Sequence, residues 1–443
     1  MESTERVVIL GGGFGGLYAA KALRKAPVQL TLLDRRNFHL FQPLLYQVAT
    51  GSLSPGEIAS PLRAILRRQR NTQVLLGEAL DLDAEHRNVI LDAGELHYDT
   101  LVVATGSSDS YFGHDDWKRV APGLKSIEEA TEIRHKILYA FEAAEKEHDP
   151  EIRREWLTFV LVGAGPSGVE LAGALGEIAH DTLRRDFRSI RPEDAVILLV
   201  EGGPRVLPTY PADLSLKAEA SLKRLGVTVR TNALVTSIEP TGVTVKLASG
   251  AEQIAARTVI WSAGVQASPL GRTLQQRAGA QLDRAGRVIV NADCSVPGHP
   301  EIFVIGDLAH LEQDGKLLPG VAQVAMQQGG YVAGLIQKRL QGHASTPFRY
   351  FDKGNLAVIG RASAVAQIGK LHLSGLLAWI IWLFVHLMYL VEFSNRILVF
   401  VHWGFLYLTF SRGARLITGS DPLPDSNPGA GTQNPETTAS RTP

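Results

Sequence analysis

The strongest constraint on the fold is a local pattern that occurs twice in the chain. Residues 7–23 run from a short β-branched segment through a glycine-rich turn into a helical pattern, and residues 158–178 repeat this order. A strand, a glycine turn and a helix in succession form the nucleotide-binding unit of doubly wound α/β proteins. The sequence therefore predicts an α/β fold with two Rossmann-like dinucleotide-binding domains.

Both turns have the G-x-G-x-x-G spacing, which suits a pyrophosphate. The first glycine makes the tight turn, the second lets the phosphates approach the backbone, and the third lets the helix pack on the strand. These glycines are Gly11, Gly13 and Gly16 in the first turn, and Gly163, Gly165 and Gly168 in the second. The strand after each turn ends in an acid, Asp34 or Glu201, that can accept hydrogen bonds from ribose hydroxyls. A glycine turn alone also serves packing, but the strand, helix and acid together favour a dinucleotide site.

Three further segments extend the pattern. Residues 98–106 form a buried strand that ends in a small-residue turn, residues 259–264 echo it, and residues 302–307 end in an acid beside a glycine. Two nucleotide folds in one chain imply two dinucleotides and favour a flavin as one of them. The ordered set of five segments resembles the two-dinucleotide-binding flavoprotein disulfide reductase superfamily. In that superfamily the acid at the position of Asp307 binds the flavin ribitol, and the chain then returns to the first domain.

The cysteine content separates this chain from the thiol-using members of that superfamily. Those members carry a redox cysteine pair or a single catalytic cysteine near the flavin. Here Cys294 is the only cysteine, and residues 34–51, which follow the first ribose acid, contain none. One cysteine excludes an intramolecular disulfide framework, a cysteine-based metal cluster and a dithiol centre within the chain. We therefore expect no metal, an inert thiol at Cys294, and electron transfer that bypasses sulfur.

Two motifs narrow the resemblance. Residues 41–51 (FQPLLYQVATG) and residues 322–327 (AQVAMQ) are similar to the type II NADH dehydrogenases, the non-electrogenic NADH:quinone oxidoreductases. The resemblance runs from about Arg6 to Arg415. It implies FAD in the first site, NADH in the second, and a membrane quinone as the electron acceptor. The chain departs from the family in having Asp34 where glutamate is common, which shortens the reach by one methylene.

The resemblance assigns residues to three binding sites. The FAD site comprises Gly11, Gly13, Phe14, Gly16, Asp34, Arg35, Thr105, Gly106, Gly306 and Asp307. The NADH site comprises Gly163, Gly165, Gly168, Glu170, Glu201, Ala263 and Gly264. The quinone site comprises Ala322, Gln323, Met326 and Gln327.

Two of these residues are catalytic candidates. Gln323 is a candidate for binding the quinone carbonyl, and Glu170 for placing the nicotinamide or carrying a proton. For Glu170, compensation of the helix dipole in the first turn is an equally good interpretation of the spacing.

The chain divides into five predicted segments. They are a first FAD-binding part (1–120), an inserted NADH-binding domain (121–290), a second FAD-binding part (291–370), membrane-anchoring helices (371–418) and a disordered tail (419–443).

Local signals mark elements within these segments. Capping boxes at Ser54 and Ser126 predict helix starts, and Asp149-Pro150 predicts a boundary. Residues 181–194 are an arginine-rich excursion that suits a solvated loop better than an anionic partner. Residues 271–291 have the pattern of a loop with short strands.

The C-terminal region is unusually apolar. Residues 375–391 contain no formal charge, but at about 1.5 Å per residue they span only about 26 Å, short of a bilayer core of about 30 Å. Residues 397–410 are shorter still. We expect two helices lying in one leaflet, a monotopic anchor on the lipid bilayer surface of the cell membrane. Four basic residues are placed to reach anionic headgroups: Lys370, Arg396, Arg412 and Arg415.

The same helices also suit a homodimer interface, and both roles can hold. The N-terminus leads directly into a strand without a signal peptide, which favours the cytoplasmic face.

Charge and acid content limit the function classes. Lys+Arg and Asp+Glu both number 45, so a general nucleic-acid-binding surface is not expected. No series of intramembrane acids is present, so ion pumping is not expected either. Two other classes remain open: a flavoenzyme that passes electrons from NADH to oxygen or to a ferredoxin-like protein, and a flavin-bound redox-sensing protein with negligible turnover.

Overall fold

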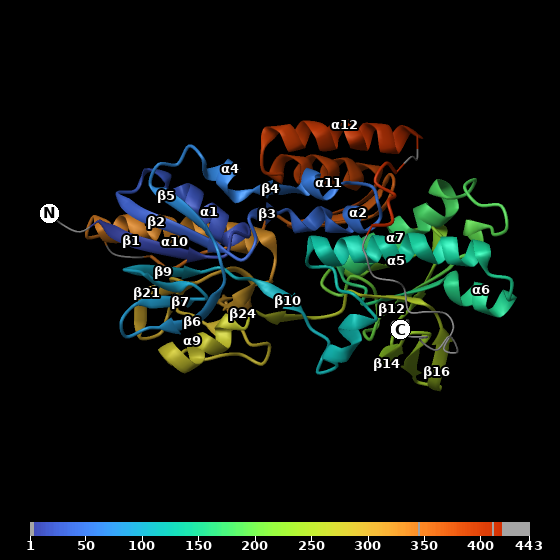
Figure 1. Ribbon diagram of the computed structural model, residues 1–443, viewed down its shortest axis with the longest axis horizontal. Helices are drawn as coiled ribbons and strands as arrows, with labels where there is room; N and C mark the ends of the chain where they lie inside the picture. The colour runs from blue at the N-terminus through green and yellow to red at the C-terminus, as the bar shows by residue number, and fades with distance from the viewer. Residues whose placement is uncertain (1–3, 344–345, 410–411, 419–443) are drawn as a thin grey trace, which may run out of the picture.

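The computed structural model describes residues 4–343, 346–409 and 412–418, and its two main sheets are wholly or mostly parallel (Figure 1). The first sheet has the strand order β20-β21-β9-β1-β2-β5. Its strands are β1 (Glu5–Leu10), β2 (Val28–Asp34), β5 (Thr72–Leu76), β9 (Thr100–Val103), β20 (Ser295–Val296) and β21 (His299–Val304). Strand β21 pairs parallel with β9, so the chain returns to the first sheet, and the strand that leads to Asp307 lies where the sequence predicted it.

The second sheet lies between these two stretches in sequence. It has the order β13-β12-β11-β17, and all three pairs of neighbours are parallel. Its strands are β11 (Thr158–Val162), β12 (Val196–Val200), β13 (Val227–Arg230) and β17 (Thr258–Trp261). The two units are joined by an antiparallel ribbon of β10 (Ser107–Asp109) and β18 (Val265–Ala267), where the chain leaves and re-enters the first unit. The prediction of two doubly wound domains, the second inserted in the first, is confirmed.

Smaller strands and turns surround the two sheets. In the first unit they are β3 (Phe38–Leu40), β4 (Ala59–Pro61), β6 (Ala79–Asp83), β7 (Asn88–Leu91), β8 (Gly94–His97), α2 (Leu45–Ala49), α3 (Pro55–Ile58) and α4 (Leu62–Leu66). In the second they are β14 (Leu234–Glu239), β15 (Gly242–Leu247), β16 (Gly250–Ala255) and α8 (Ala212–Arg224). Short strands β19 (Val288–Ile289), β22 (Ala309–His310), β23 (Glu312–Gln313) and β24 (Lys316–Leu317) precede α10 (Ala322–Leu340).

Each glycine turn leads into a helix that packs closely on another element. Helix α1 (Phe14–Ala22) lies against α10, and a Cβ added to Gly329 would be 2.2 Å from the carbonyl oxygen of Gly15. Helix α7 (Pro166–Glu177) lies against β25 (Asn355–Gly360), and a Cβ at Gly173 would be 1.7 Å from the carbonyl oxygen of Ile359. Glycine is required at both contacts because backbone occupies the space of a side chain.

Some local predictions are confirmed and others are wrong. Helix α5 (Ile127–Lys146) begins after Ser126, whose Oγ accepts a 3.2 Å hydrogen bond from the Glu129 amide, and the predicted box at Ser54 caps the single turn α3. The predicted boundary at Asp149-Pro150 lies between two helices, since α5 ends at Lys146 and Asp149 caps α6 (Pro150–Trp156). The predicted loop over residues 271–291 begins with a helix, α9 (Leu270–Ala278). Leu274 and Ala278 share its buried face, and this spacing of four residues is the helical signal that the interpretation missed.

The C-terminal region forms a third layer that covers both units (Figure 1). Strands β25, β26 (Ser363–Ile368) and β27 (Leu371–Gly375) form an antiparallel sheet, followed by α11 (Leu376–Tyr389) and α12 (Phe393–Thr409). The two predicted helices are present. The three strands pack on α7 and α8 of the second unit. Residues 355–370, which belong to the predicted second FAD-binding part, therefore lie against the second unit. The predicted disordered tail, residues 419–443, lies outside the described residues.

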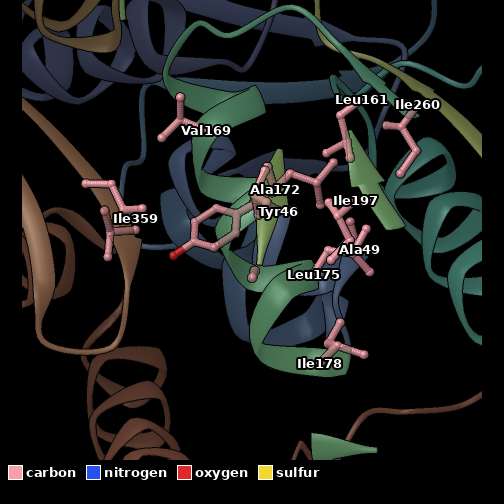
Figure 2. Packing of buried hydrophobic residues seen from close by; sticks show 14 of the residues in the cluster. Tyr46, Ala49, Leu161, Val169, Ala172, Leu175, Ile178, Ile197, Ile260 and Ile359 are labelled. Carbon is pink, nitrogen blue, oxygen red and sulfur yellow. The ribbon is translucent and has the colours of Figure 1, made fainter. Parts of the chain in front are cut away.

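Helix α7 is the centre of the largest apolar core. Figure 2 shows Val169, Ala172, Leu175 and Ile178 along the helix, with strand residues of the second sheet on one side and Ile359 of β25 on the other. Tyr46 of α2, from the first unit, lies beside the same helix (Figure 2). This core therefore joins the first unit, the second unit and the C-terminal layer.

Candidate active site

The first turn has the backbone that a phosphate-binding loop requires. Gly11 has φ +102° and donates a 2.8 Å hydrogen bond to the Leu33 carbonyl, which ties the turn to β2. A Cβ at Gly16 would lie 1.9 Å from the Gly11 carbonyl oxygen, so only glycine lets α1 start here. At Gly13 an added Cβ would meet nothing within 4 Å. The turn is therefore tight underneath and open towards the space where phosphates are expected.

Asp34 braces this turn. Its Oδ2 accepts a 2.5 Å hydrogen bond from the Gly12 amide, and its Oδ1 accepts one of 2.7 Å from the Arg36 amide. Burial raises the pKa of Asp34, and the two amide donors oppose that shift. Each carboxylate oxygen keeps a further lone pair, which is what a ribose hydroxyl needs.

The second turn repeats this geometry. Gly163 has φ +99°, and a Cβ at Gly168 would again lie 1.9 Å from a carbonyl oxygen, that of Gly163. Glu201 accepts 2.7 Å hydrogen bonds from the amides of Ala164 and Gly203. Both acids therefore hold their turns through backbone amides.

A single large cavity, about 1770 Å³, runs from the first turn to the C-terminal helices. Its wall includes every predicted FAD residue except Gly16, which lies beneath the turn. From the predicted quinone set, Ala322, Gln323 and Met326 line it and Gln327 does not. From the predicted NADH set, Glu170 lines it, together with its neighbours Pro166 and Ser167. At the far end the wall is formed by Val385, His386 and Tyr389 of α11.

Glu170 is a titratable residue of α7 that lies where the first unit, the second unit and the C-terminal layer meet. Its side chain is buried, and its Oε1 accepts a 3.4 Å hydrogen bond from the Val358 amide of β25. Burial raises the pKa of Glu170 to about 8. The first turn of α7 contains no acid, so the interpretation of Glu170 as a dipole-compensating residue is wrong. A carboxyl group with this pKa retains its proton at neutral pH, as a proton donor requires.

Two contacts that fix the site were not foreseen in the sequence. The Gly306 amide donates a 2.7 Å hydrogen bond to Oε1 of Gln328, a fully buried side chain of α10, which holds the turn before Asp307. The Ser107 hydroxyl donates to Asp307 Oδ2 at 2.8 Å. Gln328 directly follows the AQVAMQ motif, but nothing in the spacing distinguished it from a surface glutamine.

On α11, His386 stacks on Trp382 with ring centroids 4.4 Å apart, and its Nδ1 is 2.8 Å from the Trp382 carbonyl oxygen. Burial lowers the pKa of His386 to about 4, so its ring is neutral at the cavity wall.

The outer faces of α11 and α12 are strongly apolar. Their most exposed side chains are Leu376, Leu377, Ile380, Phe384, Met388, Phe393, Ile397, Leu398, Phe400, Val401, Phe405 and Leu408. Within the described ranges, no helix combines the length and the apolar character needed to cross a bilayer.

Two of the four basic residues assigned to lipid headgroups are held in ion pairs within the protein. Arg412 is buried and pairs with Glu177 at 2.9 Å, and Arg415 pairs with Asp186. That expectation is wrong for Arg412, because its guanidinium holds the C-terminal segment on α7. In the predicted arginine-rich loop, residues 181–194, the Arg184 side chain is exposed and pairs with Glu193 at 3.1 Å.

Comparison with known proteins identifies the family. Residues 5–329 match the family model described as pyridine nucleotide-disulphide oxidoreductase, and residues 353–412 match the NDH2 C-terminal domain. The chain is 48% identical over 421 residues to the type II NADH:quinone oxidoreductase Ndh of Mycobacterium tuberculosis, covering 93% of this chain and 90% of the relative. This chain belongs to the type II NADH:quinone oxidoreductases.

Solved structures agree on the fold of this type II oxidoreductase. NDH2 from Plasmodium falciparum, in complex with RYL-552, superposes with a TM-score of 0.84 at 21% identity, covering 93% of this chain and 99% of that one. The sulfide:quinone oxidoreductase of Aquifex aeolicus superposes with a TM-score of 0.73 at 19% identity, covering 89% and 92% of the two chains.

Cys294 of this type II oxidoreductase has no access to the cavity. It is fully buried in the first unit, with φ +66°, and burial raises its pKa. A buried thiol with a raised pKa is a poor nucleophile. This environment agrees with an inert thiol at Cys294, which stays a prediction.

Proposed function

We propose that the protein binds FAD in the first turn, accepts two electrons from NADH bound at the second turn, and delivers them to a membrane quinone without pumping ions. The observation that carries the proposal is the single cavity that joins the first turn, Glu170 and helix α11. Ligand pockets for one small molecule usually have about 300–1000 Å³. A cavity of about 1770 Å³ suits a long dinucleotide together with part of a second ligand.

The residues at the first turn fit FAD. The turn is open above Gly13, where the helix dipole and free amides favour a pyrophosphate. Asp34 and Asp307 line the same cavity and offer carboxylate acceptors to ribose and ribitol hydroxyls. When bound, FAD supplies the ability to accept a hydride and release two electrons. The protein binds, orients and shields the cofactor.

Glu170 is the residue that we propose for proton supply or nicotinamide placement. Its raised pKa keeps a proton on the carboxyl group at neutral pH, and its carboxyl group lies in the wall between the two nucleotide units and α11. Quinone reduction consumes protons, so a buried protonated acid beside the acceptor supports that half of the reaction. The proposed acceptor pocket is the end of the cavity lined by Gln323, Met326 and His386.

We propose that the apolar faces of α11 and α12 bind the surface of the cell membrane on its cytoplasmic side. Phe393, Phe400 and Leu408 are each more than 60% exposed, which is costly in water and favourable in lipid. Residues 375–410 contain a single acid, Glu392, so the sequence offers no proton path across the bilayer. A homodimer that covers the same faces is the second candidate role.

The anchor is tested by placing aspartate at Ile380 and Phe384, two exposed positions one turn apart on α11. Each charge costs about 2.5–3.5 kcal/mol at membrane depth, so the variant should leave the membrane fraction. Leu216→Asp, at an equally exposed position on α8, is the matched control and should stay bound. A folded, flavin-loaded double variant that remains on vesicles but becomes monomeric would make this surface a dimer interface instead.

The electron path is tested by an absorption spectrum of the purified protein with sequential additions. NADH should bleach a flavin band, and quinone should restore it. Restoration by air or by a ferredoxin-like protein, but not by quinone, would favour the other flavoenzyme class. Bleaching without steady turnover would favour a redox sensor.

A further inference from the structure

Two glutamines on α10 are bound to backbone through both ends of their amide groups. Gln327 Nε2 donates to the Phe351 carbonyl at 2.9 Å, and the Phe351 amide donates to Gln327 Oε1 at 2.9 Å. One turn earlier, Gln323 Nε2 donates to the Gly354 carbonyl at 2.9 Å, and the Lys353 amide donates to Gln323 Oε1 at 3.3 Å. The two side chains therefore pair with residues 351–354 much as one strand pairs with another.

This pairing uses half of the hydrogen-bonding capacity of each amide. A glutamine amide has two N–H donors and a carbonyl oxygen with two lone pairs, and each side chain already uses one donor and one lone pair. Gln327 does not line the cavity at all, whereas Gly354 and the following Asn355 do. Gln327 bonds Phe351, three residues before the wall residue Gly354, so it acts on the segment that leads into the wall and not on the interior.

The clamped segment carries the rim of the cavity. Lys353 Nζ donates a 2.9 Å hydrogen bond to the Tyr389 hydroxyl and lies 5.6 Å from the centre of that ring. Tyr389 is the last residue of α11 and lines the cavity. Gly354 has φ +98°, and a Cβ there would lie 2.2 Å from the Gln367 carbonyl oxygen, so the backbone that positions Lys353 has little freedom.

We propose that Gln327 is a positioning residue for the quinone half-reaction, which fixes residues 351–354 and thereby the Lys353–Tyr389 rim without touching the quinone. The inference rests on the proposed function, because the rim matters only if an acceptor enters beside α11. The next residue of α10, Gln328, lies on a neighbouring face of the helix and holds the Gly306 turn. The helix thus ties the proposed acceptor entrance to the wall of the proposed flavin site.

The test replaces Gln327 by methionine, which has a similar length but neither donates nor accepts strongly. We expect KM for a short-chain quinone to rise about tenfold, since two hydrogen bonds to the rim segment are lost. The maximal rate, the flavin content and the rate at which NADH bleaches the flavin should change less than about twofold. Gln337→Met on the same helix, where the amide donates to the Ala22 carbonyl, is the matched control and should leave KM unchanged.

A double-mutant cycle with Tyr389→Phe separates positioning from direct contact. If Gln327 acts through the rim, the double variant should be no worse than the more affected single variant. Additive effects on KM, or a Gln327→Met protein with unchanged KM, would overturn the inference.

Hydrogen exchange tests the clamp without quinone. The amides of Phe351 and Lys353 should exchange faster in Gln327→Met than in the parent, and equal exchange would also overturn the inference. Failure of the parent protein to reduce quinone would instead defeat the proposed function, and the rim role with it.

Discussion

The two glycine turns have almost the same backbone, yet different elements cover the helices that follow them. Gly11 and Gly163 have φ values of +102° and +99°, and an acid at the end of the next strand accepts an amide hydrogen bond in each turn. After the first turn, α1 packs on helix α10 of its own unit. After the second, α7 packs on β25 of the C-terminal layer. Local sequence therefore determines the backbone of each turn, whereas long-range packing determines which element covers the helix that follows.

One pair of equivalent positions in the two helices illustrates this difference. Tyr18 and Glu170 are each the second residue after the last glycine of their turns. Burial raises the pKa of both side chains, but only Glu170 lines the cavity. The comparison predicts that equivalent changes in the two turns have separable effects.

The largest effects are expected from Gly16→Ala and Gly168→Ala. Each adds a Cβ about 1.9 Å from a backbone carbonyl that has no room to move, so the turn must distort at a cost of about 3 kcal/mol or more. Gly16→Ala should yield protein nearly free of flavin. Gly168→Ala should retain flavin but lose bleaching by NADH. Absorbance ratios and stopped-flow bleaching measure both, and the opposite result would reverse the assignment of the two dinucleotides.

A smaller effect is expected on cofactor choice at the second turn. A 2′-phosphate would lie against Glu201, whose carboxylate already holds the amides of Ala164 and Gly203. Repulsion and lost hydrogen bonds suggest about 2–4 kcal/mol, so NADH should be preferred over NADPH by roughly 30- to 1000-fold in kcat/KM. Arg205 lies near in sequence and softens the preference if it reaches the phosphate. Equal kcat/KM values would show that Glu201 does not face the ribose.

Glu170 should make stability depend on pH in a direction unusual for an acid. Its pKa is raised from 4.5 in the unfolded chain to about 8 in the fold, so between these values the unfolded chain binds fewer protons. The free energy of unfolding should therefore fall as pH rises from about 4.5 to 8, and the contribution is fully present below that window. In the parent, the free energy of unfolding should fall by at least about 1.4 kcal/mol, the value of one pKa unit, over this pH range. Glu170→Gln should remove this fall. Denaturant titrations at pH 5 and pH 8.5 give the free energy of unfolding of both proteins. The same change between the two pH values in both proteins would contradict a raised pKa at Glu170.

Most of the local architecture was predictable because it depends on short-range steric requirements. The two turns, the acids at Asp34 and Glu201 and the α5 capping box are each specified within a few dozen residues. The contact that completes the site at Glu170 is long-range, because Val358 lies 188 residues away in the sequence. Gln328 is only 22 residues from Gly306, but it comes from a helix face without a distinctive pattern.

The errors have the same physical origin. Arg412 was assigned to lipid headgroups because it follows an apolar helix, but Glu177, on the C-terminal turn of α7, neutralises it in the core. Gln323 and Gln327 were assigned to the quinone site from a motif, and this assignment stays a prediction; in the structure both amides also pair with backbone, and only Gln323 lines the cavity. Sequence shows which groups are available for hydrogen bonding, but only tertiary packing shows which of them are already bound.

The smallest effect is expected from Tyr18→Phe, the counterpart of Glu170→Gln. Tyr18 is partly buried on α1 near the charged Arg396 of α12, and removing its hydroxyl should change stability by less than about 1 kcal/mol. Flavin content, NADH bleaching and quinone turnover should match the parent, whereas Glu170→Gln should slow quinone turnover more below pH 8 than above it if the acid supplies protons, because above pH 8 the parent carboxyl has already lost its proton. The pair is informative because each change removes one titratable group at the same position after equivalent turns. Comparable losses of turnover in both variants would mean that the helix position itself, and not its covering layer, determines the chemistry.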